Sequence, residues 1–194
     1  MCDLPEALAD APATLVCAPP MQGGGSGRCR ALLDAADPTE TVVWVTYNRS
    51  PAACVEQYRE RGGDATAVVV AVGETAVGAD DTLADAEVAT VSTPADLTGL
   101  GIALSRALSS HDDVTCCFDS LTALLQYADR ETAFEFLHAV TAQLYAADAT
   151  AHVHLDPTVH DDRTVDALAS LFNALVDVTG DTREVRVRES VTSD

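Results

Sequence analysis

The chain has 194 residues, which suits one domain of ordinary size and is too short for two. Its 31 acidic and 11 basic residues give a formal net charge of −20, and every basic residue is arginine. Binding to phosphate backbones or anionic lipids needs a cationic surface, so this balance argues against a nucleic-acid partner and against membrane attachment.

The acidic, lysine-free composition is typical of adaptation to high salt. Molar salt shortens the Debye length to about 3 Å, so a shell of carboxylates loses most of its self-repulsion. The first ten residues lack the basic region of a signal peptide, and no apolar run approaches the roughly 20 residues that span a bilayer. We therefore expect an acidic, halophilic and cytoplasmic protein.

The six cysteines show no CxxC spacing. Cys17, Cys116 and Cys117 lie inside apolar runs. This pattern predicts buried, reduced thiols in a cytoplasmic protein rather than a disulfide framework.

Short Val-rich runs alternate with longer helical patterns along the chain. In the first half, strands are predicted over residues 14–18, 41–47, 65–72 and 87–92. Helices are predicted over 28–36 and 51–61, and an exposed acidic loop over 73–86. In the second half, helices are predicted over 94–109, 120–127, 130–147 and 164–175. The remaining strands are predicted over 114–118, 150–155, 176–179 and 184–188, with the last at a sheet edge.

Strands that read as continuous apolar runs are covered on both faces, and their alternation with helices predicts an α/β fold with a mostly parallel central sheet. We expect an N-terminal extension over 1–12, a single domain over 13–189 and a frayed tail over 190–194. Ligands of such sheets bind beyond the carboxyl ends of the strands. The loops that matter most are therefore 19–28, 48–50 and 119–122.

A glycine-rich segment follows the first predicted strand, where a phosphate loop would stand. A phosphate loop reads Gly-x-x-x-x-Gly-Lys-Ser/Thr; here Gln22, Arg28 and Cys29 replace its first glycine, its lysine and its hydroxyl residue. The candidate nucleotide-binding residues of this loop are Gly23, Gly24, Gly25, Ser26, Gly27, Arg28 and Cys29. One interpretation is residual binding of ATP and Mg²⁺, and the other is a flexible turn without a ligand.

The segment VTCCFDSLTALLQY places an aspartate at the tip of a buried strand, as a Walker B segment does. Asp119 there would hold Mg²⁺, usually through water, with Ser120 beside it. Capping of the helix that follows is the competing explanation for the Asp119-Ser120 pair.

The order of the glycine loop, WVTYNRSP and FDSLTALLQY resembles RecA-like P-loop ATPases of the KaiC/RadA branch. Together with PADLTGLGIALS and TVDALASLF, these segments resemble the halophilic-archaeal HTR-like proteins of unknown function. The resemblance covers roughly residues 12–180. It implies a RecA-like three-layer sandwich in which Asp119 is the Walker B residue.

This chain departs from the active members of that family. Where they carry acidic residues after the second strand, it has Asn48 and Arg49, and neither accepts a proton at neutral pH. With the degenerate Walker A loop, these losses predict a pseudo-ATPase that acts in signal transduction or regulation through protein partners. Two alternatives stay open: an ATPase that uses Arg28 in place of lysine, and a metal-binding protein. Assembly into a homo-oligomer also stays open.

The metal-binding alternative depends on His152, His154 and Asp156. Side chains alternate along a strand, so all three would lie on one face. Imidazole and carboxylate ligands suit Zn²⁺ or Mn²⁺. Hydrogen-bonded histidines at a strand end are the other interpretation.

Overall fold

The structure is a computed structural model that describes residues 8, 11–19, 41–60, 63–64, 66–77, 82–83, 86–177 and 184–187. The strands are β1 (Ala13–Cys17), β2 (Thr41–Thr46), β3 (Ala67–Val72), β4 (Thr82–Leu83), β5 (Ala86–Val91), β6 (Val114–Asp119), β7 (Thr150–Leu155), β8 (Ala174–Asp177) and β9 (Glu184–Val187). The α-helices are α3 (Pro51–Arg59), α4 (Leu97–Ser110), α5 (Leu121–Leu124), α6 (Arg130–Ala146) and α7 (Asp162–Ala169), and two 3₁₀ helices span Gly73–Ala76 and Pro157–Val159.

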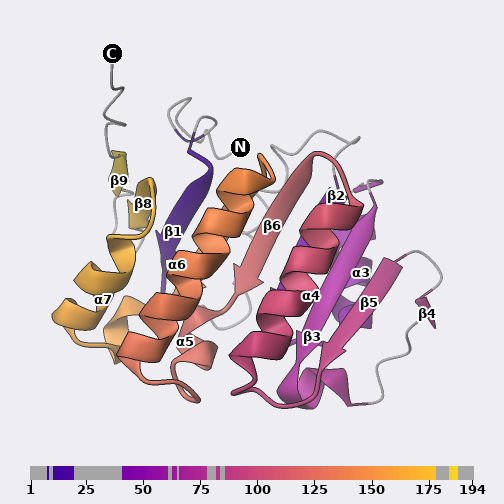
Figure 1. Ribbon diagram of the computed structural model, residues 1–194, viewed down its shortest axis with the longest axis horizontal. Helices are drawn as coiled ribbons and strands as arrows, with labels where there is room; N and C mark the ends of the chain where they lie inside the picture. Colours follow the sequence, from indigo (N-terminus) through magenta and orange to yellow (C-terminus); the bar gives the residue numbers. More distant parts are fainter. Residues whose placement is uncertain are drawn as a thin grey trace.

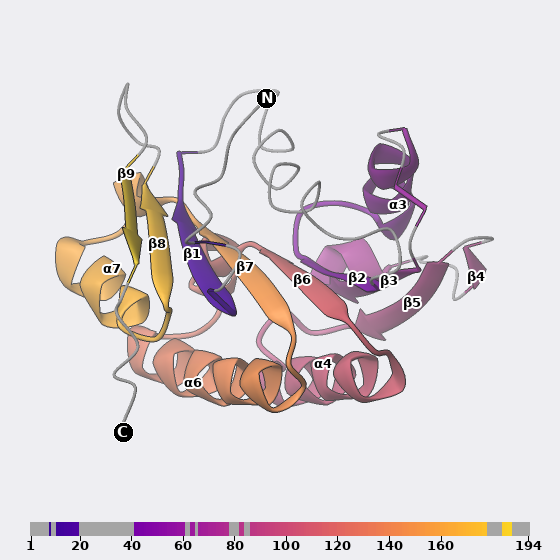
Figure 2. The ribbon, with the colours of Figure 1, turned by 90° about the horizontal axis from the view of Figure 1, so that it is seen from above.

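The nine strands form one sheet in the order β4-β5-β3-β2-β6-β7-β1-β8-β9 (Figure 1). All neighbouring strands run parallel except the two outermost pairs, β4/β5 and β8/β9. Helices α4 and α6 lie against one face of the sheet and α3 against the other (Figure 2). The expected α/β three-layer sandwich with a mostly parallel sheet is therefore confirmed.

The strand sequences explain why both faces are covered. Every residue of β2 and β3 is buried, as continuous apolar runs require. The larger core lies between the sheet and α4 and α6, where Leu100, Leu104 and Leu137 are fully buried. A smaller core joins β2 and β3 to α3 through Trp44, which packs edge-on against Tyr58.

The last helical prediction was wrong at its carboxyl end. The pattern predicted a helix over 164–175, but α7 ends at Ala169 and residues 174–177 form β8. Asn173 explains the change, because its backbone N–H donates to the carbonyl of Ala13 and its side-chain oxygen accepts from the backbone N–H of Ala13. Parallel pairing with β1 thus overrides the helical spacing of the apolar residues.

The structure also bears on the predictions for one loop, one edge strand, the cysteines and membrane-spanning helices. The loop predicted over 73–86 contains the 3₁₀ helix Gly73–Ala76 and the short strand β4. The predicted edge position of β9 is confirmed. Cys17, Cys54, Cys116 and Cys117 are buried and unbridged. The helix predicted over 28–36 lies outside the described residues. Among the helices that are described, none has the length and apolarity needed to cross a membrane.

Candidate functional site

The candidate site lies at the carboxyl ends of β2 and β6, which are neighbours in the middle of the sheet. Asp119 is the last residue of β6 and pairs with Thr46, the last residue of β2. The pairing continues one step further, because the backbone N–H of Tyr47 donates to the carbonyl of Asp119 at 3.1 Å. Parallel strands end at the same edge, so residues that follow β2 lie beside Asp119.

Thr46 shapes the turn that follows β2. Its hydroxyl accepts a hydrogen bond from the backbone N–H of Arg49 at 3.0 Å and donates to the carbonyl of the same residue at 3.2 Å. Ser50 then caps α3 by accepting from the backbone N–H of Ala53 at 3.3 Å. Because both ends of the turn are held by side chains, the direction of the Arg49 side chain is set locally.

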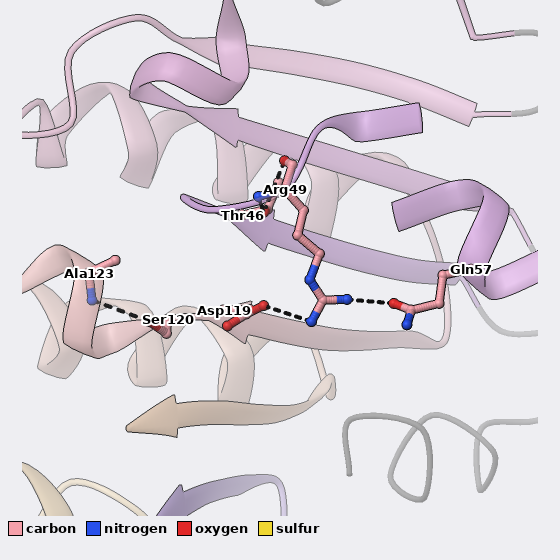
Figure 3. A network of polar contacts seen from close by, with 6 residues as sticks. All are labelled: Thr46, Arg49, Gln57, Asp119, Ser120 and Ala123. Atoms are coloured by element: carbon pink, nitrogen blue, oxygen red, sulfur yellow. Dashed lines mark hydrogen bonds and ion pairs between the residues drawn. The ribbon is translucent and has the colours of Figure 1, made fainter. Parts of the chain in front are cut away.

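Arg49 reaches across to the tip of β6 (Figure 3). Its Nη2 lies 3.3 Å from Oδ2 of Asp119, and its Nη1 donates to Oε1 of Gln57 on α3. The side chains of Arg49 and Asp119 are 31% and 26% exposed, so water screens the pair only in part. An internal cation therefore neutralises the carboxylate at the tip of β6.

The residues that directly follow the two strands beside this pair, Tyr47 and Ser120, are uncharged. Burial, and then the neighbouring Tyr127, raise the pKa of Tyr47, so its phenol stays neutral. The Tyr47 ring lies 6.2 Å from that of Phe118. Ser120 caps α5, since its hydroxyl accepts from the backbone N–H of Ala123 at 3.2 Å. The capping role expected for the Asp119-Ser120 pair therefore belongs to the serine.

Among the described residues, the ion pair with Arg49 works against a magnesium ion bound directly to Asp119. Mg²⁺ takes oxygen ligands in near-ideal octahedral geometry, and Oδ2 of Asp119 already forms an ion pair with a guanidinium. A divalent cation there would have to displace Arg49 or accept a positive neighbour at close range. The candidate phosphate loop, with Gly23, Gly24, Gly25, Ser26, Gly27, Arg28 and Cys29, lies outside the described residues, as does Gln22.

The histidine-rich strand β7 lies next to β6 on the side away from β2. The rings of His152 and His154 are 5.3 Å apart and nearly perpendicular. Asp156 has another role: its Oδ1 accepts from both the backbone N–H and the hydroxyl of Thr158 at 2.9 and 2.7 Å, which caps the 3₁₀ helix that follows.

The third residue near the two histidines is Cys117. Its Sγ and one ring nitrogen of each histidine all lie within 4.8 Å of one another. Among the described residues, these three form the group of possible metal ligands whose ligand atoms lie within that distance of one another. Asp156 does not belong to the group. Cys117 could not be assigned to this group from the local sequence, because the register that pairs it with His152 is a property of the folded sheet.

Comparison with known proteins agrees with this architecture. Residues 12–178 match a family described as "Family of unknown function (DUF7504)". The chain belongs to this family. No curated protein is similar enough to this DUF7504 member to match it.

One similar solved structure is that of the KaiC-like protein PH0186 from the hyperthermophilic archaeon Pyrococcus horikoshii OT3. The similarity has a TM-score of 0.54 at 12% sequence identity, and it covers 93% of this chain and 80% of that chain. At this identity the likeness shows the fold alone. The DUF7504 chain therefore has a KaiC-like, RecA-type fold, as the resemblance predicted.

Proposed function

We propose that this chain is a catalytically degenerate RecA/KaiC-like domain, a pseudo-ATPase that acts as a cytoplasmic signalling or regulatory protein-interaction module in a halophile. The observation that carries the proposal is the ion pair between Arg49 and Asp119. In phosphoryl transfer, the Walker B carboxylate helps to hold the metal ion that neutralises developing charge. Here the chain supplies its own cation, which carries five N–H donors and no acceptor and therefore cannot activate water.

The sequence adds two further losses. The glycine loop has Arg28 where a phosphate loop has lysine, and Cys29 where it has the hydroxyl residue, which makes it a degenerate Walker A motif. Asn48 and Arg49 stand where active relatives carry a carboxylate. Phosphoryl transfer depends on positioning and charge neutralisation by these parts, so their joint loss favours a scaffold that binds partners over one that turns over ATP.

Phosphate release and calorimetry with ATP and Mg²⁺ in molar KCl test this function. We expect no release above the protein-free blank, both for the natural chain and for Asp119→Asn. Asp161→Asn is the matched control, because it makes the same change of acid to amide at the cap of α7. Turnover that Asp119→Asn abolishes and Asp161→Asn retains would contradict the proposal.

A nucleotide-binding ATPase with an atypical phosphate loop is the second candidate. Its support is topological: β1 is parallel to β7, β7 is parallel to β6, and so the chain leaves β1 at the same edge as Asp119. Binding of ATP would then depend on Arg28. ATP affinity that falls at least tenfold in Arg28→Ala but not in the neighbouring Arg30→Ala would favour this candidate over the first.

The halophilic setting and the relation to HTR-like proteins are part of the first proposal. A net charge of −20 repels itself most strongly when salt is dilute. We therefore expect the melting temperature to rise between 0.1 and 2 M KCl. A melting temperature that is flat or falls across this range would count against a halophilic protein. Light scattering in the same buffers distinguishes a monomer from a homo-oligomer.

A further inference from the structure

The face of the sheet that carries α3 is not uniformly apolar. Beside the apolar residues of β2 and β3, the paired strands β6 and β7 place hydroxyl, thiol and imidazole groups at every second position of their register. Thr115 and Thr150 form one step, with their hydroxyls 3.0 Å apart. Cys117 and His152 form the next step on the same face. His154 follows two residues later on the same strand, so it shares that face.

We propose that Cys117, His152 and His154 form a binding site for a borderline-soft transition-metal ion of the Zn²⁺ class. Thiolate and imidazole are the two protein ligands that Zn²⁺ prefers, and three protein donors leave one position of a tetrahedron for water or another ligand. This site uses neither residue of the ion pair between Arg49 and Asp119, although Cys117 and Asp119 share one face of β6. The proposal therefore stands or falls independently of the pseudo-ATPase function.

The distances are compatible with this chemistry. Zn–S bonds of about 2.3 Å and Zn–N bonds of about 2.0–2.1 Å place tetrahedral ligand atoms about 3.3–3.6 Å apart. The three donor atoms already lie within 4.8 Å of one another. The remaining difference of at most about 1.2–1.5 Å is within the reach of χ rotations in side chains whose backbones are held by the β-ladder.

Burial also favours an ion that needs few water ligands. Cys117 is 0% exposed and His152 is 3% exposed, and His154 is half-buried. Binding exchanges the Cys117 S–H for a sulfur–metal bond, and the displaced proton passes to the buffer. Each imidazole binds the metal through the lone pair of one ring nitrogen.

Cys116 provides a matched control. It is the neighbour of Cys117 on β6 and is 2% exposed, but it packs in the core on the opposite face with α4 and α6. The two cysteines therefore share strand and burial and differ in the face they occupy. A serine at either position removes one buried thiol, while only Cys117→Ser removes a proposed ligand.

The test uses the full chain without a histidine tag, in reducing buffer with molar KCl, and with Zn²⁺ and Co²⁺ as probes. We expect one equivalent of Zn²⁺ to bind and Co²⁺ to show a thiolate-to-metal charge-transfer band. Cys117→Ser should abolish that band and weaken Zn²⁺ binding at least tenfold, while Cys116→Ser retains both. A band that survives in Cys117→Ser, or a natural chain that binds Zn²⁺ no more tightly than this variant, would overturn the site.

A second variant guards against a folding defect. His154→Asn changes the half-buried ligand, so it disturbs packing less than a change at Cys117. It should keep the circular dichroism spectrum of the natural chain and still lose at least tenfold in Zn²⁺ affinity. Unchanged affinity in a folded His154→Asn variant would also overturn the proposal.

Discussion

The ion pair between Arg49 and Asp119 makes a quantitative prediction. At the observed separation of 3.3 Å, Coulomb's law gives about 1.3 kcal/mol in a medium as polar as water and about 5 kcal/mol at an effective dielectric constant of 20. Exposures of 31% and 26%, together with the entropy lost in ordering a long arginine, bring the net value toward that of surface pairs. We expect a coupling free energy of about 1 kcal/mol in 0.1 M KCl.

A double-mutant cycle isolates this coupling. The four proteins are the natural chain, Arg49→Met, Asp119→Asn and the double variant, and urea unfolding gives each free energy. Arg49→Met also loses the hydrogen bond to Gln57, worth about 1 kcal/mol, but this loss occurs on both sides of the cycle and cancels. Urea is uncharged, so the salt concentration can be varied separately, and sucrose in every sample keeps the fold at low salt.

Salt provides the decisive comparison. In 1 M KCl the Debye length of about 3 Å is close to the separation of the pair, so screening leaves about half of the coupling that is present at 0.1 M. We therefore expect about 0.3–0.5 kcal/mol in molar salt. A coupling below about 0.2 kcal/mol at 0.1 M, or equal values at both salt concentrations, would refute a stabilising electrostatic interaction between Arg49 and Asp119.

Three further predictions concern stability and reactivity. Leu137→Ala, in the buried face of α6, should cost about 2–5 kcal/mol in urea unfolding, whereas Ile102→Ala, which is 51% exposed, should stay within about 0.5 kcal/mol; equal losses would contradict the assignment of the core. Hydrogen bonds from the hydroxyl and then the backbone N–H of Thr164 lower the pKa of Asp161, so its stabilising contribution is complete above the unfolded pKa of about 3.9 and is lost as the pH falls through the lower folded pKa. Thermal melts should accordingly show a shallower acid limb in Asp161→Asn, and an unchanged limb would contradict this. Burial, and then Asp177, raise the pKa of Cys17 to about 11, so iodoacetamide at pH 8 should label Cys17 only after unfolding; mass spectrometry of peptides from the native protein would reveal the opposite result.

Local pattern was sufficient for much of the architecture. The continuous Val-rich runs that form β2 and β3, and the helical spacing of apolar residues in α6, are visible in the local sequence, so each element can be predicted from its own residues. Alternation of such runs with helices was enough to predict a parallel sheet with covered faces. Asp119 at a strand tip was visible for the same reason.

Pairing between distant segments decided the rest. Asn173 joins β1 across 160 residues, and this contact ends α7 early although the apolar spacing continues. Arg49 meets Asp119 only because β2 and β6 are neighbours, and Cys117 meets His152 only through the register of β6 against β7. Local sequence determines which face of its strand a residue occupies. Which residues lie beside it across that face depends on the strand order and register of the whole sheet. These follow from the free energy of the complete fold and cannot be deduced from a short segment.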